Sequence, residues 1–369
     1  MHYSFFKKSL LLLSFLLSVF CLNAQDLSRK NIKIPDIPGY ITLKCDFHIH
    51  TVFSDGLVWP TVRVEEAWRE GLDAIAITEH IEYRPNIEDI PGDHNRSYDI
   101  AKPFADEKGI ILVKAAEITR GMPPGHLNAL FINDANKLDQ EDFMTVMEET
   151  ARQDAFVFWN HPGWKAQQPD TMNWFDVHTQ LLEKGWLHGI EIVNFHEYYP
   201  QAINWCIDKK LTMIANSDIH DPVKMEYDYA NGDRRPLTLV FAKDRSEKAI
   251  KEALKTRMTA LLFDDLIIGE EQILKDLFHS CVEIKKPEIW FEDGDWDKIL
   301  ITNHSELKIK IKGHSSSTGI NIPKDVSLMP ESTHEFWFKK NSELSSEIKV
   351  QIQVVNFQTG ASNFLTTEL

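Results

Sequence analysis

From Leu43 onward the chain alternates short apolar runs with amphipathic helical patterns, and this alternation limits the folds that it can adopt. Near-continuous apolar runs are typical of strands buried on both faces of a parallel sheet. The sequence therefore predicts an α/β fold, either doubly wound or closed into a barrel. The expected strands are residues 43–49, 74–78, 110–116, 127–132, 155–159, 190–194, 212–215 and 237–241. Helical patterns between them cover residues 62–70, 143–153, 203–209 and 246–257.

The pattern changes near residue 280, which indicates a second domain. The later apolar segments alternate with polar residues or are β-branched, and polar turn residues join them without any helical pattern. These features predict a small antiparallel β-sandwich. The expected strands there are residues 299–302, 307–311, 334–338 and 348–355. We expect the α/β domain to cover residues 25–280 and the sandwich to cover residues 281–369.

The first residues have the features of a secretory signal peptide. Lys7 and Lys8 precede an apolar run of twelve residues, which is too short to span a bilayer. Small residues then place the expected cleavage after Ala24, so we expect residues 1–24 to be removed and the protein to be secreted or periplasmic. A lipoprotein anchored through Cys21, and an uncleaved membrane anchor, are the less favoured alternatives.

Composition narrows the class of ligand. The net charge is -16 at pH 7, and no basic stripe of the kind that binds extended nucleic acid is visible. A small phosphate ester remains compatible with this charge, because bound divalent cations invert the charge of a site. The cysteines outside the signal peptide, Cys45, Cys206 and Cys281, lack metal-ligand spacing, so we expect buried thiols, with a single disulfide as the open alternative.

His48 and His50 lie one residue apart at the end of the first expected strand. Residues i and i+2 of a strand point to the same face, so the two imidazoles can meet at one point. Further metal-ligating side chains occur at the ends of other expected strands, where functional groups collect in α/β folds. These are Asp55, His80, Glu117, His161, Asp218 and His220, with His126 as an exception at a strand start. Each has an ordinary structural explanation alone, but together they predict a multinuclear metal site.

The same positions resemble the motifs of the polymerase and histidinol phosphatase (PHP) superfamily of metal-dependent phosphoesterases. The motifs are His48-Ile49-His50-Thr51 continuing through Ser54-Asp55-Gly56, Thr78-Glu79-His80, Asn160-His161-Pro162 and Ser217-Asp218-Ile219-His220. The resemblance covers about residues 43–242, and all nine expected ligand positions are filled. It implies a distorted seven-stranded β/α barrel, one strand fewer than the pattern predicts. Within the family, the chain is most similar to secreted bacterial phosphodiesterases.

The resemblance also implies how the ligands are shared among up to three metal ions. The first ion is expected on His48, His50, Glu117 and Asp218. Glu117 would bridge to a second ion, which is also held by His80 and His161. The third ion is expected on Asp55, His126 and His220.

This ligand set predicts hydrolysis of a phosphate ester. Imidazole and carboxylate ligands suit Zn, Mn or Fe, and two bridged ions can hold a hydroxide that attacks phosphorus. We expect a phosphodiesterase or phosphatase with two to three divalent ions, in which Asp218 and His220 take part in catalysis. Arg120, three residues after Glu117, is the favoured cation for gripping phosphate, and a surface salt bridge is its equally weighted alternative. Weaker candidates for substrate binding are Arg84, Lys165 and His196.

Other residues near the motifs have open roles. Glu79, beside His80, is either a group that orients a ligand imidazole or a solvated carboxylate. Three tryptophans could wall a substrate pocket, although core packing is the more common fate of tryptophan. They are Trp59, Trp159 and Trp164. The sequence identifies no acid for the leaving group and no oligomeric state.

Two alternative functions stay open. Amidohydrolase-like barrels also begin with paired histidines, but a metal-bridging lysine late in the strand series would be expected for that chemistry. A non-catalytic metal or carbohydrate binder would use the sandwich, with an exposed aromatic platform. Trp290, Trp296 and Trp337 are the candidates for that platform.

Overall fold

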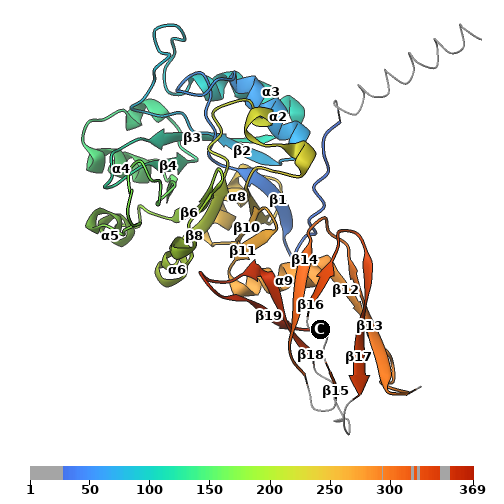
Figure 1. Cartoon of the computed structure of the whole chain (residues 1–369). Helices are drawn as coiled ribbons and strands as arrows, with labels where there is room; N and C mark the ends of the chain where they lie inside the picture. Colours follow the sequence, from blue (N-terminus) through green and yellow to red (C-terminus); the bar gives the residue numbers. More distant parts are fainter. Residues whose placement is uncertain (1–27, 293, 317–319, 322–324, 341–349) are drawn as a thin grey trace, which may run out of the picture.

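The computed structural model describes residues 28–292, 294–316, 320–321, 325–340 and 350–369, which form two domains (Figure 1). The expected signal peptide, residues 1–24 with Cys21, lies outside the described residues. Within the described part of the chain, no helix is long and apolar enough to cross a membrane. The first domain is α/β, and the described part of the second is built of strands and the turns between them.

Seven strands of the first domain are neighbours in a ring. They are β1 (Ile41–Asp46), β2 (Ala74–Ile77), β3 (Ile111–Ile118), β4 (Leu127–Leu130), β5 (Phe156–Trp159), β6 (Gly189–Asn194) and β8 (Thr212–Asn216). A parallel bridge between Ile49 and Ile219 joins the segment after β8 to the segment after β1. This bridge closes the ring, so the expected seven-stranded β/α barrel is confirmed.

All eight expected strands are present, but two of them do not have the parallel direction expected of the sheet. β4 runs antiparallel to both β3 and β5, because only eight residues link β3 to β4 and a parallel crossover needs a dozen or more. The eighth strand, β9 (Leu237–Ala242), runs antiparallel to β1. It continues through β10 (Thr259–Phe263) and β11 (Leu266–Gly269) toward the second domain.

Helices follow the strands and begin or end at residues suited to those positions. Pro60 starts the helix after β1, where its fixed φ and missing N–H cost nothing, and Gly71 ends that helix with a φ of 88°. Asp142 and Ser246 cap two other helices through their side chains. The helices are α2 (Pro60–Glu70), α3 (Arg96–Lys108), α4 (Phe143–Arg152), α5 (Asp176–Glu183), α6 (Pro200–Lys209), α7 (Val223–Glu226), α8 (Glu247–Lys255) and α9 (Glu271–Cys281). Short elements are η2 (Ala135–Leu138), η3 (Tyr229–Asn231) and β7 (Glu197–Tyr198).

The second domain contains two packed sheets. One sheet has the order β12, β13, β17, β15, and the other contains β16, β14, β18 and β19. The bounds are β12 (Val282–Lys285), β13 (Trp296–Asn303), β14 (Ile309–Ser316), β15 (Ile320–Asn321), β16 (Asp325–Leu328), β17 (Thr333–Lys340), β18 (Val350–Gln358) and β19 (Phe364–Glu368). β18 pairs in parallel with β11, so the second sheet continues the sheet of the barrel domain. One apolar core, which includes Phe278 and Phe357, extends through both domains.

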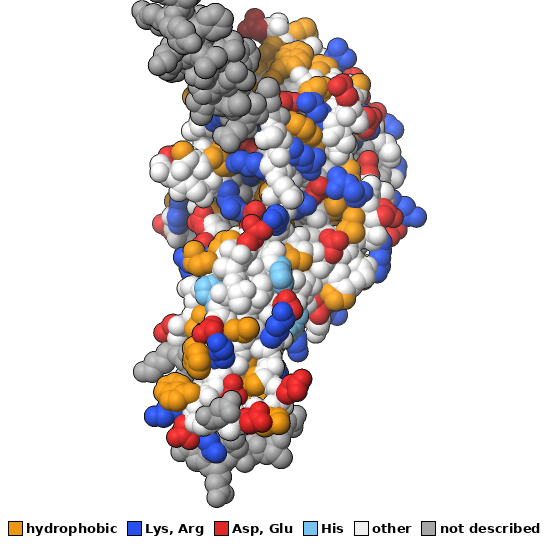
Figure 2. All heavy atoms as spheres, turned by 90° about the vertical axis from the view of Figure 1, so that its right-hand side faces the viewer, with side chains coloured by type: hydrophobic (Ala, Val, Ile, Leu, Met, Phe, Trp, Pro, Cys, Tyr) orange, Lys and Arg blue, Asp and Glu red, His pale blue; other side chains and the backbone are white. Residues whose placement is uncertain are grey.

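Burial and surface charge test further expectations. Cys45, Cys206 and Cys281 are buried free thiols, as expected. Of the three sandwich tryptophans, Trp290 packs against Phe338, whereas Trp296 and Trp337 are 58% and 45% exposed. Figure 2 shows acidic and basic side chains interspersed over one face that includes both domains, without a continuous basic stripe.

Candidate metal centre

The nine expected ligands gather at one edge of the ring, where the carboxyl ends of the parallel strands open into loops. His126 is brought there by the reversed direction of β4. Its neighbour Leu127 pairs with Ile118, so the start of β4 lies beside the end of β3. The exception noted in the sequence is therefore explained by strand direction.

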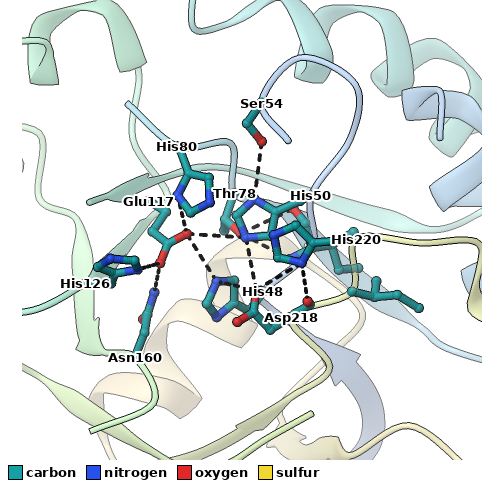
Figure 3. A network of polar contacts seen from close by, with 12 residues as sticks. His48, His50, Ser54, Thr78, His80, Glu117, His126, Asn160, Asp218 and His220 are labelled. Carbon is teal, nitrogen blue, oxygen red and sulfur yellow. Dashed lines mark hydrogen bonds and ion pairs between the residues drawn. The ribbon is translucent and has the colours of Figure 1, made fainter. Parts of the chain in front are cut away.

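Four side chains form the innermost group (Figure 3). Nε2 of His48 and Nε2 of His50 each lie 3.1 Å from Oδ1 of Asp218, and they lie 3.4 and 3.3 Å from Oε2 of Glu117. All four atoms are buried, and within the described part of the chain their polar contacts are ion pairs and not hydrogen bonds. Ligands held about 2.0–2.2 Å from a tetrahedral ion lie roughly 3.3–3.6 Å apart, which is close to this spacing.

The outer nitrogens of both histidines show that, when the rings are neutral, these inner atoms need a cation. Nδ1 of His48 lies 2.9 Å from Glu191, which can only accept, so Nδ1 carries the proton. Nδ1 of His50 lies 3.3 Å from Oγ of Ser54, whose own proton is donated to Glu79. In the neutral rings both Nε2 atoms are then acceptors, and they face carboxylate oxygens that are acceptors too. A shared cation removes this conflict, so the four residues fit a metal ion.

The remaining ligands form two further groups, which differ from the expected ones. His80 Nε2 and His220 Nε2 lie 3.4 and 3.2 Å from Oδ1 of Asp55. His126 does not join them, because its Nδ1 lies 2.9 Å from Glu117 Oε1. His161 also faces that oxygen, with its Nε2 at 3.8 Å. His126 therefore lies with Glu117 and not with Asp55, whereas His80 lies between the two groups, because its Nδ1 is 2.8 Å from Glu117 as expected and its Nε2 faces Asp55.

The charges of the cluster stabilise one another. Burial opposes a charged imidazole, yet Glu117 and Asp55 raise the pKa of His80 to about 11. Burial has the same effect on His220, and Asp55 and Asp218 outweigh it and raise its pKa to about 9. Burial would raise the pKa of Asp218, but the surrounding histidines hold it well below its usual range. Without metal, protons on the histidines supply the positive charge that these carboxylates need.

Glu191, which the sequence analysis did not single out, orients two of the candidate ligands. It is fully buried on β6. One oxygen accepts from His48 Nδ1 at 2.9 Å and Asn216 Nδ2 at 2.8 Å, and the other accepts from the backbone N–H of His161 at 2.8 Å and Asn194 Nδ2 at 2.9 Å. The sequence feature that could have identified Glu191 is its position as a single acidic residue within an apolar strand pattern.

Two more buried polar groups support the ligands in roles that the sequence did not predict. Asn160 donates from Nδ2 to Glu117 and to Asn128, both at 2.9 Å, which fixes the carboxylate. Asp46 accepts from the backbone N–H and the hydroxyl of Ser217, directly before a candidate ligand. Their signal was position alone, since each stands beside a motif histidine or strand end.

Arg63 on α2 ties two ligand-bearing loops together. It is 1% exposed and donates to the carbonyl of His50 at 2.8 Å and to the carbonyls of residues 219–221. Glu79 is buried, so the expectation of a solvated carboxylate is wrong, and it reaches a ligand imidazole only through Ser54. It accepts from the hydroxyl of Ser54, which in turn accepts from His50, so its effect on His50 is indirect.

The backbone at the site is constrained. A Cβ on Gly56 would lie 2.7 Å from the carbonyl carbon of His50, so only glycine fits beside Asp55. His161, Phe195 and Asp218 have φ values of 27°, 54° and 50°, in the left-handed region that non-glycine residues rarely adopt. Each follows the end of a strand at the site, where such strain is commonly concentrated.

A cavity of about 440 Å³ opens over the cluster. Besides seven of the nine candidate ligands it is lined by aromatic, polar and acidic residues, and none of its described lining residues is lysine or arginine. The other lining residues are Tyr83, Thr119, Trp164, Asn194, Phe195, Glu197 and Glu226. The bridging lysine required by the amidohydrolase-like alternative is therefore not found among them. Of the expected pocket tryptophans, Trp164 lines this cavity and Trp159 is buried in the core.

The expected phosphate-binding cations do not line the cavity. Arg120 pairs with Glu82 at 3.0 Å and donates to two loop carbonyls, which is the salt-bridge alternative. Arg84 donates to two backbone carbonyls, and Lys165 donates to one. His196 is exposed and faces a backbone carbonyl. Their loops lie on the expected side, but local acceptors hold the side chains elsewhere.

Comparison with known proteins agrees with this architecture. A family model described as an Ig-like domain matches residues 282–369. The crystal structure of a two-domain protein from Bacteroides vulgatus ATCC 8482, containing a predicted PHP-like metal-dependent phosphoesterase, is 46% identical with a TM-score of 0.89. The match covers 93% of this chain and 98% of that one. A search of curated protein sequences finds no match.

Two more distant structures were also found. A putative metal-dependent phosphoesterase from Bifidobacterium adolescentis ATCC 15703 is 16% identical with a TM-score of 0.39, over 48% of this chain and 87% of that chain. An amidohydrolase from Chromobacterium violaceum is 13% identical with a TM-score of 0.37, over 48% of this chain and 88% of that chain. At 46% identity over nearly the whole length of both chains, the first match is decisive. This chain belongs to the family of two-domain proteins that contain a PHP-like metal-dependent phosphoesterase.

Proposed function

We propose that this protein is an exported phosphoesterase that hydrolyses small phosphate esters, with a preference for diesters. The observation that carries the proposal is the set of buried acceptor atoms that face one another on His48, His50, Glu117 and Asp218. Such atoms are costly unless a cation joins them. Export rests on the signal-peptide features of residues 1–24.

The chain's own residues would hold two to three divalent ions, of which Zn, Mn and Fe suit the ligand types. His48, His50, Glu117 and Asp218 would hold the first ion. Glu117 would also serve a second, with His126 and His161, while Asp55, His80 and His220 would serve a third. When bound, such ions polarise a phosphoryl oxygen and lower the pKa of attacking water.

The protein residues prepare this site in three ways. Glu191 and Ser54 hold the His48 and His50 rings with Nε2 turned inward. Asn160 fixes the Glu117 carboxylate. The cavity provides no lysine or arginine among its described residues to neutralise the second charge of a monoester, so a singly charged diester is the better fit.

The test is hydrolysis by protein stripped of metal and reloaded with Zn²⁺, Mn²⁺ or Fe²⁺. We expect bis-p-nitrophenyl phosphate to be cleaved with a higher kcat/KM than p-nitrophenyl phosphate. His48→Ala and Asp218→Ala should abolish this activity, whereas His304→Ala, at an exposed histidine of the second domain, should not. Activity that survives either site substitution, or no hydrolysis with any of the metals, would overturn the proposal.

A further inference from the structure

The part of the cavity beyond the metal ligands has a distinct chemistry. Its described wall has no lysine or arginine and combines three aromatic residues with two carboxylates. The aromatic residues are Tyr83, Trp164 and Phe195, and the carboxylates are Glu197 and Glu226. A wall that had to receive an anionic or sugar-phosphate substituent would be expected to offer cationic or bidentate donors instead.

Two of the aromatic side chains stand at the rim with their surfaces open. Trp164 is 39% exposed, and its ring centroid lies 5.2 Å from that of His161 and 5.8 Å from that of His126. Tyr83 is 52% exposed, and its ring centroid lies 5.9 Å from that of His80. A substituent on a phosphorus atom held at these histidines would therefore meet the indole and the phenol ring.

The two carboxylates come from β7 and α7, which follow β6 and β8 in the chain. Glu197 is on β7, two residues beyond the strained Phe195, and it accepts the hydroxyl proton of the buried Tyr199. Glu226 is the last residue of α7, and it lies beside the loop that carries His220. Neither belongs to the three groups of candidate metal ligands, so both charges remain available to a bound substrate.

Aromatic faces together with carboxylates recognise ammonium groups, above all quaternary ones that cannot donate hydrogen bonds. We propose that the substrate is a phosphodiester in which one alcohol carries a quaternary ammonium or amine. Trp164 and Tyr83 would contact the cation, and Glu197 and Glu226 would balance its charge. This inference rests on the proposed phosphoesterase function and adds the substrate class.

Two esters of equal shape test the charge alone. One is p-nitrophenyl phosphorylcholine, and the other is its isostere p-nitrophenyl 3,3-dimethylbutyl phosphate, in which an uncharged carbon replaces the quaternary nitrogen. In each reaction the oxygen of one water forms a bond to phosphorus, the bond to p-nitrophenolate breaks, and the water protons pass to solvent. Both reactions therefore have the same leaving group and the same optical readout.

For the metal-loaded protein we expect kcat/KM to be about tenfold higher for the choline ester. The double variant Glu197→Gln/Glu226→Gln and the variant Trp164→Leu should each bring the ratio toward one. Glu183→Gln, the same change at an exposed residue of α5, should leave the ratio at its wild-type value. Added NaCl should also reduce the preference, because it screens exposed charges.

Binding gives a readout that does not depend on turnover. In saturation-transfer NMR, the methyl groups of choline should show contact with the wild-type protein, and 3,3-dimethylbutanol should show less. Equal kcat/KM for the two esters, or a ratio unchanged by the double substitution, would overturn the substrate class while bis-p-nitrophenyl phosphate is still cleaved. If no ester is cleaved at all, the proposed function itself fails, and this inference fails with it.

Discussion

Replacing Glu191 by glutamine tests whether a buried carboxylate sets the metal affinity of this protein. Glu191 accepts four hydrogen bonds, two on each oxygen, and every partner is a donor. Glutamine keeps the shape but turns one oxygen into an NH₂ group. In either orientation of the amide, two of the four donors then face this NH₂ group.

The rearrangement that restores a hydrogen bond at the lowest energy is a change of tautomer at His48. If its Nδ1 loses the proton and accepts from the NH₂ group of the new amide, the proton moves to Nε2, which is the atom directed at the metal position. Changes of this kind typically cost 10–100-fold in metal affinity, or about 1.4–2.7 kcal/mol. If His48 keeps its tautomer, the two unmade buried bonds cost about 1–3 kcal/mol each in the free energy of unfolding.

Metal titration against a competing chelator measures the affinity, and urea unfolding of the metal-free protein measures the stability. The matched control is Glu149→Gln on α4, a glutamate that is also buried but contacts Arg152 and Gln153, away from the cluster. The control should lose stability without losing metal affinity. If Glu191→Gln binds metal as tightly as the wild-type protein, the proposed role of Glu191 is wrong.

Three further outcomes are expected. Burial lowers the pKa of His178 to about 4. The unfolded chain, whose histidine has a pKa of about 6.5, therefore binds protons more readily than the folded protein as the pH falls. Between pH 7 and 4.5 the wild-type protein should lose free energy of unfolding for this reason. In urea unfolding, His178→Gln should lose about 2 kcal/mol less over the same range. Lys210 is exposed with a φ of 56°, so Lys210→Gly should raise the free energy of unfolding by about 0.5–1 kcal/mol, whereas Lys209→Gly, at the last residue of α6 and under no such constraint, should lower it, since it also removes the contact of the Lys209 ammonium with the Trp174 ring. Protein in free metal at a hundred times Kd should lose about 2.7 kcal/mol of its free energy of unfolding when EDTA removes the metal. Calorimetry measures this loss, and an unchanged Tm would contradict metal binding to the folded cluster.

The positions of the barrel strands were predictable because burial on both faces leaves a strong apolar pattern. The direction of β4 was not taken from that pattern, although the eight-residue link to β3 already excluded a parallel crossover. This one reversal also explains the position of His126. The metal cluster was therefore predictable as a set, while its division into groups depended on strand direction and ring orientation.

The supporting residues were harder to predict for a physical reason. Arg63 acts through backbone carbonyls of residues 50 and 219–221, and no sequence pattern records which carbonyls a side chain will reach. For Arg120 the sequence predicted a role that the structure does not support. Its spacing from Glu117 suggested a phosphate ligand, but Glu82 and two nearby carbonyls satisfy its guanidinium first. Chemical type is readable from sequence, whereas competition among local partners is decided by the fold.

The contact between the two domains is also decided by the fold and was not predicted from the sequence, and it affects the cavity. The change of pattern near residue 280 indicated a separate module, yet Ile267 pairs with Phe357 across the boundary and continues the barrel sheet. Beside this junction, the hydroxyl of Tyr198 donates to Gln358 of the second domain at 2.7 Å. Tyr198 adjoins Glu197, so the sandwich braces the short strand that carries an acidic residue of the cavity wall. A domain that a sequence pattern marks as an appendage thus contributes to the shape of the proposed substrate site.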